Sequence, residues 1–165
     1  MIKFHNDIVS MAACFLIGIM FFVGYVKALP FSLKPLKTGY VAQYKQVSTL
    51  ATLVMIYQPD CAWCKKQGKL LAKVFEQCKA TLNPVLIGTK GNARKLKKEL
   101  KHYHKGIPAF MADRSFLRSI GGYQASPTLL IFDTSGDLIA KKRGYIAKDK
   151  LTSALKLLTN GKCEI

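Results

Sequence analysis

The stretch 50-LATLVMIYQPDCAWC-64 joins an apolar run to two cysteines that are separated by two residues. Its first part, residues 50–57, is uncharged and rich in Leu, Val, Ile and Thr, a composition typical of a buried strand. Gln58-Pro59-Asp60 ends that run, and apolar residues at helical spacing follow through residues 70–78. A strand, a tight turn and a CxxC motif that opens a helix together indicate a redox-active cysteine pair.

The position of the first cysteine predicts its chemistry. Free backbone N–H groups and the helix macrodipole stabilise a thiolate at a helix N-terminus, and Lys65 and Lys66 add positive charge one turn later. We therefore expect Cys61 to be the nucleophile. Cys64 is expected to be the resolving thiol, which closes the Cys61–Cys64 disulfide and releases a mixed-disulfide partner. Trp63 is expected to offer an apolar face to unfolded or extended substrates.

Two other interpretations of the CxxC motif are an inert structural disulfide and half of a zinc site. Zinc would need two more ligands, for which His102 and His104 are the candidates. They lie two positions apart on a helical pattern and would point to different faces, and no second CxxC motif occurs. We therefore expect no metal, and no cofactor other than the redox-active disulfide.

The first 28 residues predict a signal peptide or an N-terminal membrane anchor. Residues 8–26 are uncharged and about long enough to cross a bilayer. Val26-Lys27-Ala28 resembles a cleavage site, and a buried helix of the domain is disfavoured because the segment has no polar face. If the segment stays uncleaved, the lysines that follow it favour a cytoplasmic domain, whereas the cysteine chemistry favours export. Cys14 lies within the apolar run, where we interpret it as incidental.

The chain is strongly basic, with 26 Lys and Arg against 9 Asp and Glu and a formal net charge of +17. The densest cluster, residues 90–105, is helical in pattern and most simply explained as a solvated face. An anionic membrane or an acidic protein surface is the next interpretation. We expect no nucleic-acid partner, because Tyr103 is the cluster's only aromatic residue and no nucleic-acid-binding motif is present.

The remaining chain predicts alternating strands and helices. Residues 29–48 read as a linker and a short N-terminal extension, with a short helix at 40–47, and residues 49–165 read as a single domain. Within that domain, strands are expected at 50–57, 85–87, 128–132 and 138–143, a turn at 134–137, and helices at 62–82, 92–104, 110–120 and 148–158.

This element order, with CxxC at the start of the first helix, resembles the thioredoxin superfamily over residues 50–158. A second motif, 125-ASPT-128 directly before an apolar strand, carries the same resemblance. It implies an α/β fold with a central mixed four-stranded sheet, β-α-β-α-β-β-α, and a helical insertion before a cis-proline. Pro127 would be that cis-proline, which is the residue type that adopts cis bonds at low cost. Ser126 and Pro127 would flank the cysteine pair and offer backbone groups to a substrate strand.

Departures from thioredoxin itself narrow the resemblance. The dipeptide between the cysteines is Ala-Trp, and Met55 occupies the position of a buried aspartate. Together with the leader and the longer helical insertion, these features resemble exported Dsb-type thiol:disulfide interchange proteins, of the isomerase and conjugative-transfer accessory type. We expect a redox potential of roughly −270 to −120 mV, an interval that spans reductase, isomerase and oxidase.

The resemblance also bears on Cys78 and Cys163. In a thioredoxin-like fold the first and last helices lie on the same face of the sheet and run away from the redox site. Cys78 near the end of the first and Cys163 after the last would then meet, and we expect a structural disulfide between them. Two free thiols, with Cys78 in the core, remain the alternative.

These features predict an exported thiol–disulfide oxidoreductase or isomerase that acts on protein cysteines by mixed disulfides. Assembly of an envelope or secretion apparatus is the expected context, and the location is periplasmic or anchored in the inner membrane facing the periplasm. Expected partners are cysteine-containing protein substrates and a redox partner protein. Two alternatives stay open: a membrane-anchored reductase of the cytochrome c maturation type, and a redox-inert thioredoxin-fold binding module.

Overall fold

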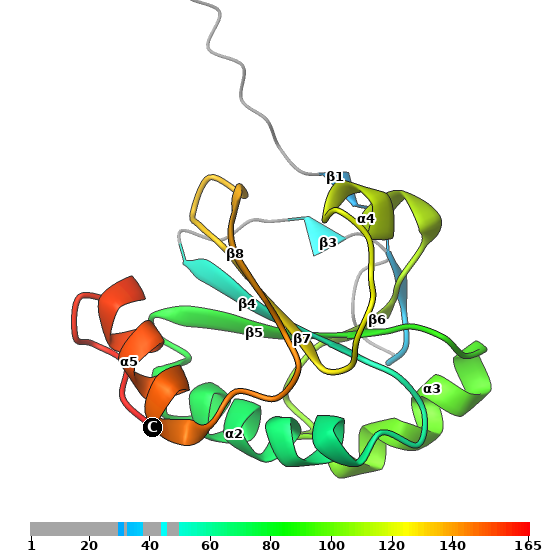
Figure 1. Cartoon of the computed structure of the whole chain (residues 1–165), viewed down its shortest axis with the longest axis horizontal. Helices are drawn as coiled ribbons and strands as arrows, with labels where there is room; N and C mark the ends of the chain where they lie inside the picture. Colours follow the sequence, from blue (N-terminus) through cyan, green and yellow to red (C-terminus); the bar gives the residue numbers. More distant parts are fainter. Residues whose placement is uncertain (1–29, 32, 38–43, 46–49) are drawn as a thin grey trace, which may run out of the picture.

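The computed structural model describes residues 30–31, 33–37, 44–45 and 50–165, and a mixed sheet forms its centre (Figure 1). The sheet has six strands in the order β2-β6-β5-β4-β7-β8, in which β4, β5 and β6 are parallel neighbours and the other pairs are antiparallel. A separate antiparallel pair joins β1 to β3. The strands are β1 (Pro30–Phe31), β2 (Lys34–Pro35), β3 (Tyr44–Lys45), β4 (Ala51–Tyr57), β5 (Leu82–Gly88), β6 (Ala109–Met111), β7 (Thr128–Phe132) and β8 (Leu138–Arg143).

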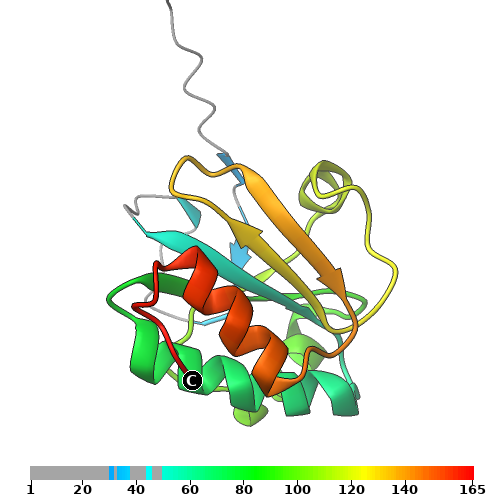
Figure 2. The ribbon, with the colours of Figure 1, turned by 60° about the vertical axis from the view of Figure 1, so that its left-hand side comes forward.

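Helices cover both faces of the sheet unequally. Figures 1 and 2 show α2, α3 and α5 on one face and α4 on the other. The helices are α2 (Ala62–Cys78), α3 (Ala93–Glu99), which continues into the 3-10 turn η1 (Leu100–His102), α4 (Arg114–Ser119) and α5 (Lys148–Leu158). The sheet is therefore the middle layer of a three-layer α/β fold.

The uninterrupted apolar run of β4 follows from this layering. Leu53, Met55 and Tyr57 pack into the core beneath α2 and α5, whereas Val54 and Ile56 pack into the core beneath α4. All seven residues of β4 are buried, because each face of the strand meets a hydrophobic layer. The strand that leads into the cysteine pair is thereby held on both sides.

The predicted number of four strands in the sheet is wrong. The sheet contains β5, β4, β7 and β8, and two further strands, β6 and β2, extend it beyond β5. The helix expected at 110–120 forms only over its second half, as α4. Its first residues form β6 beside β5, and Asp113 then starts α4 by accepting a hydrogen bond from Phe116 N at 2.7 Å. Sheet pairing overrides the helical spacing of these residues, and the short Asp side chain marks a new helix start.

Boundaries shift where tertiary pairing extends or shortens an element. The strand expected at 85–87 spans Leu82–Gly88 and includes Pro84. Strand β6 pairs with β5 only from Leu86 onward, so Pro84 lies where β5 has one neighbour and a missing N–H is tolerated. The helix expected at 62–82 ends at Cys78, and the one expected at 92–104 ends as α3 at Glu99, followed by η1.

Part of the predicted linker and extension is built into the fold. Leu33 and Leu36 are buried, and the ammonium of Lys37 donates to the carbonyls of Lys105, at 2.9 Å, and of Ile107. Of the short helix expected at 40–47, the structure describes two residues, and these form β3. The predicted leader and its apolar stretch lie outside the described residues, and no helix among those described is long and apolar enough to span a membrane.

The Leu130→Ala variant is expected to lose about 3 kcal/mol of unfolding free energy, because Leu130 is fully buried in β7 and its removal leaves a cavity. The matched control is Leu157→Ala, since Leu157 is 83% exposed in α5 and should change stability by less than about 0.5 kcal/mol. Urea unfolding of both variants measures the difference. Equal losses would contradict the described layering.

Candidate active site

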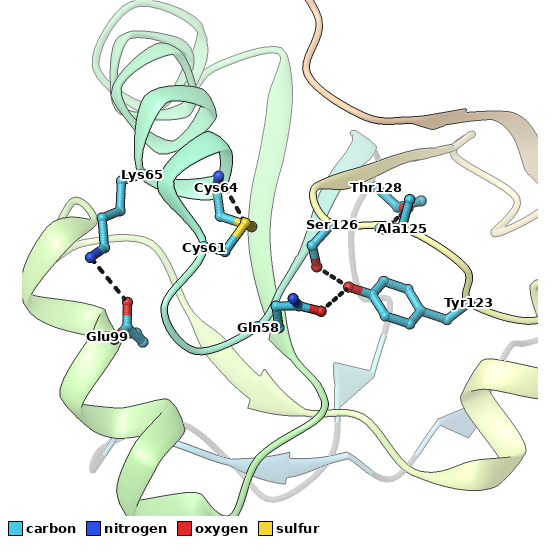
Figure 3. Close-up of a disulfide and its surroundings, with 9 residues drawn as sticks. All are labelled: Gln58, Cys61, Cys64, Lys65, Glu99, Tyr123, Ala125, Ser126 and Thr128. Carbon is cyan, nitrogen blue, oxygen red and sulfur yellow. Dashed lines mark hydrogen bonds and ion pairs between the residues drawn. A yellow bond between two sulfur atoms is a disulfide. The ribbon is translucent and has the colours of Figure 1, made fainter.

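Cys61 is the N-cap residue of α2, at the end of the turn that follows β4 (Figure 3). Its Sγ accepts a hydrogen bond from the backbone N–H of Cys64 at 3.1 Å, and its carbonyl accepts from Lys65 N at 3.1 Å. Asp60 enters the turn with φ at 55°, a left-handed conformation that Asp tolerates better than most residues. The backbone thus presents the Cys61 sulfur at the positive end of a 17-residue helix.

The two sulfurs have different environments. Cys61 and Cys64 are disulfide-bonded, with Cα atoms 5.2 Å apart. Cys64 is fully buried against the core, whereas Cys61 is half-buried. Between them, Trp63 is 57% exposed. An incoming sulfur therefore reaches Cys61 more readily than Cys64.

The loop that carries Ser126 and Pro127 is tied to the turn before Cys61. The Ser126–Pro127 peptide bond is cis, and β7 begins directly after it at Thr128. The hydroxyl of Tyr123 forms hydrogen bonds with Ser126 Oγ and with Gln58 Oε1, the latter at 3.2 Å (Figure 3). Gln58 directly precedes the Pro59-Asp60 turn, so one phenol connects the two chain segments that border the disulfide.

A buried carboxylate lies on the other side of α2. Glu99, at the end of α3, is 6% exposed, and its Oε2 lies 3.9 Å from Lys65 Nζ. That oxygen has no hydrogen-bond partner in the described part of the chain. In Figure 3 the side chain of Lys65 extends away from the cysteine pair toward Glu99. Because residue 55 is Met, β4 provides no acidic side chain at this face. The buried acid is Glu99, which comes from α3.

The second cysteine pair lies at the opposite end of α2. Cys78, the last residue of that helix, is disulfide-bonded to Cys163, with Cα atoms 5.2 Å apart and both residues buried. Thr159 Oγ1 accepts a hydrogen bond from Cys163 N at 2.9 Å and so orients the segment after α5. This pair is remote from the exposed surface around Cys61.

No group of three or more His, Cys, Asp and Glu residues in the described ranges could hold a metal ion. His104 is engaged in packing: its ring stacks on Phe75 with centroids 4.6 Å apart, and its Nδ1 accepts from Gly106 N at 3.1 Å.

Several solved structures with a similar fold are named as thioredoxins or thiol–disulfide proteins. An exposed lipoprotein thioredoxin from Streptococcus pneumoniae superposes with a TM-score of 0.65 at 18% identity, covering 78% of this chain and 99% of its own. A thiol-disulfide isomerase from Corynebacterium glutamicum gives 0.68 at 11% identity, with 82% and 97% covered. A secreted Mycobacterium tuberculosis disulfide oxidoreductase gives 0.63 at 13% identity, with 78% and 96% covered. The chain has a thioredoxin-like fold.

In sequence comparisons, no family model and no curated protein matches this thioredoxin-like chain. The resemblance to the thioredoxin superfamily and its Dsb-like members is confirmed at the level of the fold.

Several residues around the thioredoxin-like site carry no motif that could have revealed them. Gln67 is fully buried in α2, and its Oε1 accepts from Ile146 N at 2.8 Å. Tyr145, in the loop between β8 and α5, stacks against Trp63. Glu99 lies in a run that the sequence presents as a basic helix. Each becomes part of the site through tertiary packing between elements that are distant in sequence.

The burial of the phenol that connects the loops predicts that the unfolding free energy of this domain falls at alkaline pH. Burial raises the pKa of Tyr123 to about 12, whereas a phenol in the unfolded chain ionises near pH 10. The contribution of the neutral Tyr123 phenol to the unfolding free energy is therefore complete below about pH 10, and it is lost as the pH rises toward about 12. Burial, followed by the charge of Glu99, also raises the pKa of Tyr103, which adds a decline in the same direction.

The Tyr123→Phe variant is accordingly expected to show a shallower loss of unfolding free energy than the wild type between about pH 9 and about pH 11. Urea unfolding at the two pH values measures the loss, and absorbance at the phenolate band counts the ionising groups. Identical pH dependences for the two proteins would contradict the burial of this phenol.

Proposed function

We propose that this chain is an exported thiol–disulfide oxidoreductase that acts on protein cysteines through Cys61 and Cys64. The observation that carries the proposal is the asymmetry of the pair: a half-buried Cys61 sulfur accepts an N–H hydrogen bond at a helix N-terminus, above a fully buried Cys64. Hydrogen bonding and the helix dipole both favour the thiolate of Cys61, the form that attacks disulfides. The thioredoxin-like neighbours named as disulfide oxidoreductases and isomerases support the same chemistry.

The reaction proceeds in two exchanges. In the reduced protein the Cys61 thiolate attacks one sulfur of a substrate disulfide, so that a Cys61–substrate bond forms and the second substrate sulfur leaves as a thiolate. Cys64 then loses its proton and attacks the Cys61 sulfur, which forms the Cys61–Cys64 disulfide and releases the first substrate thiolate. Two electrons pass to the substrate, and a dithiol redox partner protein must return them.

Trp63, Ser126 and Pro127 are proposed to bind the substrate beside that sulfur. Trp63 supplies exposed apolar surface, and the loop with the cis Ser126–Pro127 bond supplies backbone groups for an extended substrate. The carbonyl of Pro127 already accepts from Gly144 N at 2.8 Å, so part of this backbone is committed within the protein.

An extracytoplasmic location is proposed on three grounds. The apolar, uncharged residues 8–26 have the composition of a signal peptide or anchor. The buried Cys78–Cys163 bond suits an oxidising compartment. Two neighbours are named as an exposed lipoprotein and a secreted protein. Within that compartment we propose a reductase or isomerase role in assembling an envelope or secretion apparatus, because the Ala-Trp dipeptide lacks the histidine that favours strong oxidants.

Equilibration with glutathione tests the redox proposal. The purified protein is incubated across a range of reduced-to-oxidised glutathione ratios, quenched with acid, and alkylated with a heavy maleimide. We expect the Cys61–Cys64 pair to titrate between roughly −270 and −120 mV. A pair that stays oxidised at every ratio, and is not reduced by dithiothreitol without denaturant, would overturn the proposal in favour of a redox-inert binding module.

A further inference from the structure

We infer that Trp63, Lys66 and Tyr145 form a surface that selects protein substrates with an acidic residue close to the target cysteine. This inference rests on the proposed disulfide exchange and deepens it by naming a substrate class. The three side chains, called the selecting surface below, come from the first turns of α2 and from the loop between β8 and α5.

The loop that carries Tyr145 is fixed on both sides. Gly144 N donates to the carbonyl of Pro127 at 2.8 Å, which joins the loop to the segment that borders the disulfide. Ile146 N donates to the buried Oε1 of Gln67 at 2.8 Å, which joins it to α2. Tyr145 is thus held between the two elements that flank the cysteine pair.

The rings and the ammonium are assembled as one unit. The ring centroids of Trp63 and Tyr145 lie 5.4 Å apart, and Lys66 Nζ lies 5.1 Å from the first centroid and 4.8 Å from the second. Both Trp63 and Lys66 are exposed. The two rings attract the ammonium and orient it. Lys66 has no carboxylate within ion-pair distance in the described part of the chain, which leaves its charge for a partner.

The chain around the selecting surface is mostly basic, and the acids nearest in sequence, Asp60 and Asp149, lie just outside the two segments that build it. The segments 61–69 and 142–148, which build it, carry six Lys and Arg residues and no Asp or Glu. Glu99 pairs with Lys65 and leaves Lys66 unneutralised. A substrate carboxylate would therefore be attracted, and a substrate lysine repelled.

Spacing limits where the acidic residue can lie. Trp63 is two residues from Cys61, and Lys66 is five residues from it, about 7.5 Å along the axis of α2. An extended substrate rises about 3.3 Å per residue, so a side chain within about three positions of the target cysteine reaches the ammonium. Its apolar neighbours can lie on the exposed face of Trp63.

Three peptide disulfides test this selection. They share one sequence with a single disulfide and differ in carrying Glu, Gln or Lys two positions from a cysteine, and each is reduced by the pre-reduced protein under pseudo-first-order conditions. We expect the Glu peptide to react about 10-fold faster than the Lys peptide at low ionic strength, with the ratio falling as salt is added.

The Lys66→Met variant should reduce that ratio to about 3-fold or less, because one of the attracting charges is lost. Any change in Cys61 reactivity affects all three peptides equally and cancels in the ratio. Lys73→Met is the matched control: Lys73 is an exposed lysine about two turns further along α2, and its removal should keep the ratio.

Equal rates for the Glu and Lys peptides with the wild type would overturn the inference. Equal losses of selectivity in the Lys66→Met and Lys73→Met variants would also overturn it, because the selectivity would then come from net charge alone. The Gln peptide separates this result from the proposed function. If the protein reduces the Gln peptide but shows no preference between the charged peptides, the proposed disulfide exchange is still supported and only the selection is wrong. If the protein reduces none of the peptides, both the proposed function and the selection are contradicted.

Discussion

The Cys61→Ser protein is expected to reduce insulin disulfides at least on the order of 1,000-fold more slowly than the wild type, since Cys61 has the only sulfur among the described cysteines that is placed for the first attack. Cys61 is half-buried at the N-terminus of α2, and Cys64 lies beneath it with no exposure. A serine hydroxyl at the same position does not ionise near neutral pH and cannot form the mixed disulfide.

The Cys64→Ser protein supplies the contrast. It keeps the attacking sulfur but has no thiol to release the substrate, so we expect one turnover and an accumulating Cys61–substrate disulfide. Insulin turbidity measures the first effect, and a mass shift that dithiothreitol reverses measures the second. Equal activity of Cys61→Ser and wild type, or trapping by Cys61→Ser in place of Cys64→Ser, would contradict the assigned roles.

The Cys78→Ala protein is expected to lose about 4–5 kcal/mol of unfolding free energy under oxidising conditions, because the bond closes a loop between residues 85 positions apart. For a domain of this size, that loss lowers the melting temperature by on the order of 10–20 °C. Both sulfurs are buried, so the substitution also leaves a small cavity, whose cost adds to that of the lost loop closure. Thermal melting without reductant measures the change.

A background that lacks the redox pair isolates this effect. In a Cys61→Ser, Cys64→Ser protein, dithiothreitol should lower the melting temperature, and in the same protein with Cys78→Ala and Cys163→Ala it should change nothing. A Cys78→Ala protein that melts with its parent would show that these thiols are free, which is the alternative the sequence leaves open.

The sequence predicts those parts of the fold whose signals are local. The apolar run of β4, the breaker before Cys61 and the apolar spacing of α2 lie within one continuous stretch, and each forms as expected. The segment around Phe110 differs, because its residues satisfy helical spacing but gain more by adding β6 to the free edge of β5. Such pairing depends on a neighbour far away in sequence, and no local pattern reveals it.

The site divides in the same way. Cys61, Trp63 and Cys64 share one motif, and Pro127 stands directly before an apolar strand, so a reader of the sequence can find them. Tyr145 and Glu99 have no motif, because they join the site only when the loop before α5 and the end of α3 pack against α2. Cys78 and Cys163 meet for a similar reason, and the resemblance to a known fold supplied the geometry.

The length of α2 has a consequence for how the protein acquires its disulfides. Cys163 follows Cys78 by 85 residues, so a chain that enters an oxidising compartment N-terminus first exposes Cys78 before its partner. During that interval Cys78 is an unpaired thiol on the same chain as Cys61 and Cys64, the proposed redox pair. Once α2 forms, however, the fourteen residues from Cys64 to Cys78 set them about 21 Å apart, far beyond disulfide reach. The helix therefore acts as a spacer that keeps Cys78 out of reach of the proposed redox pair until Cys163 is available.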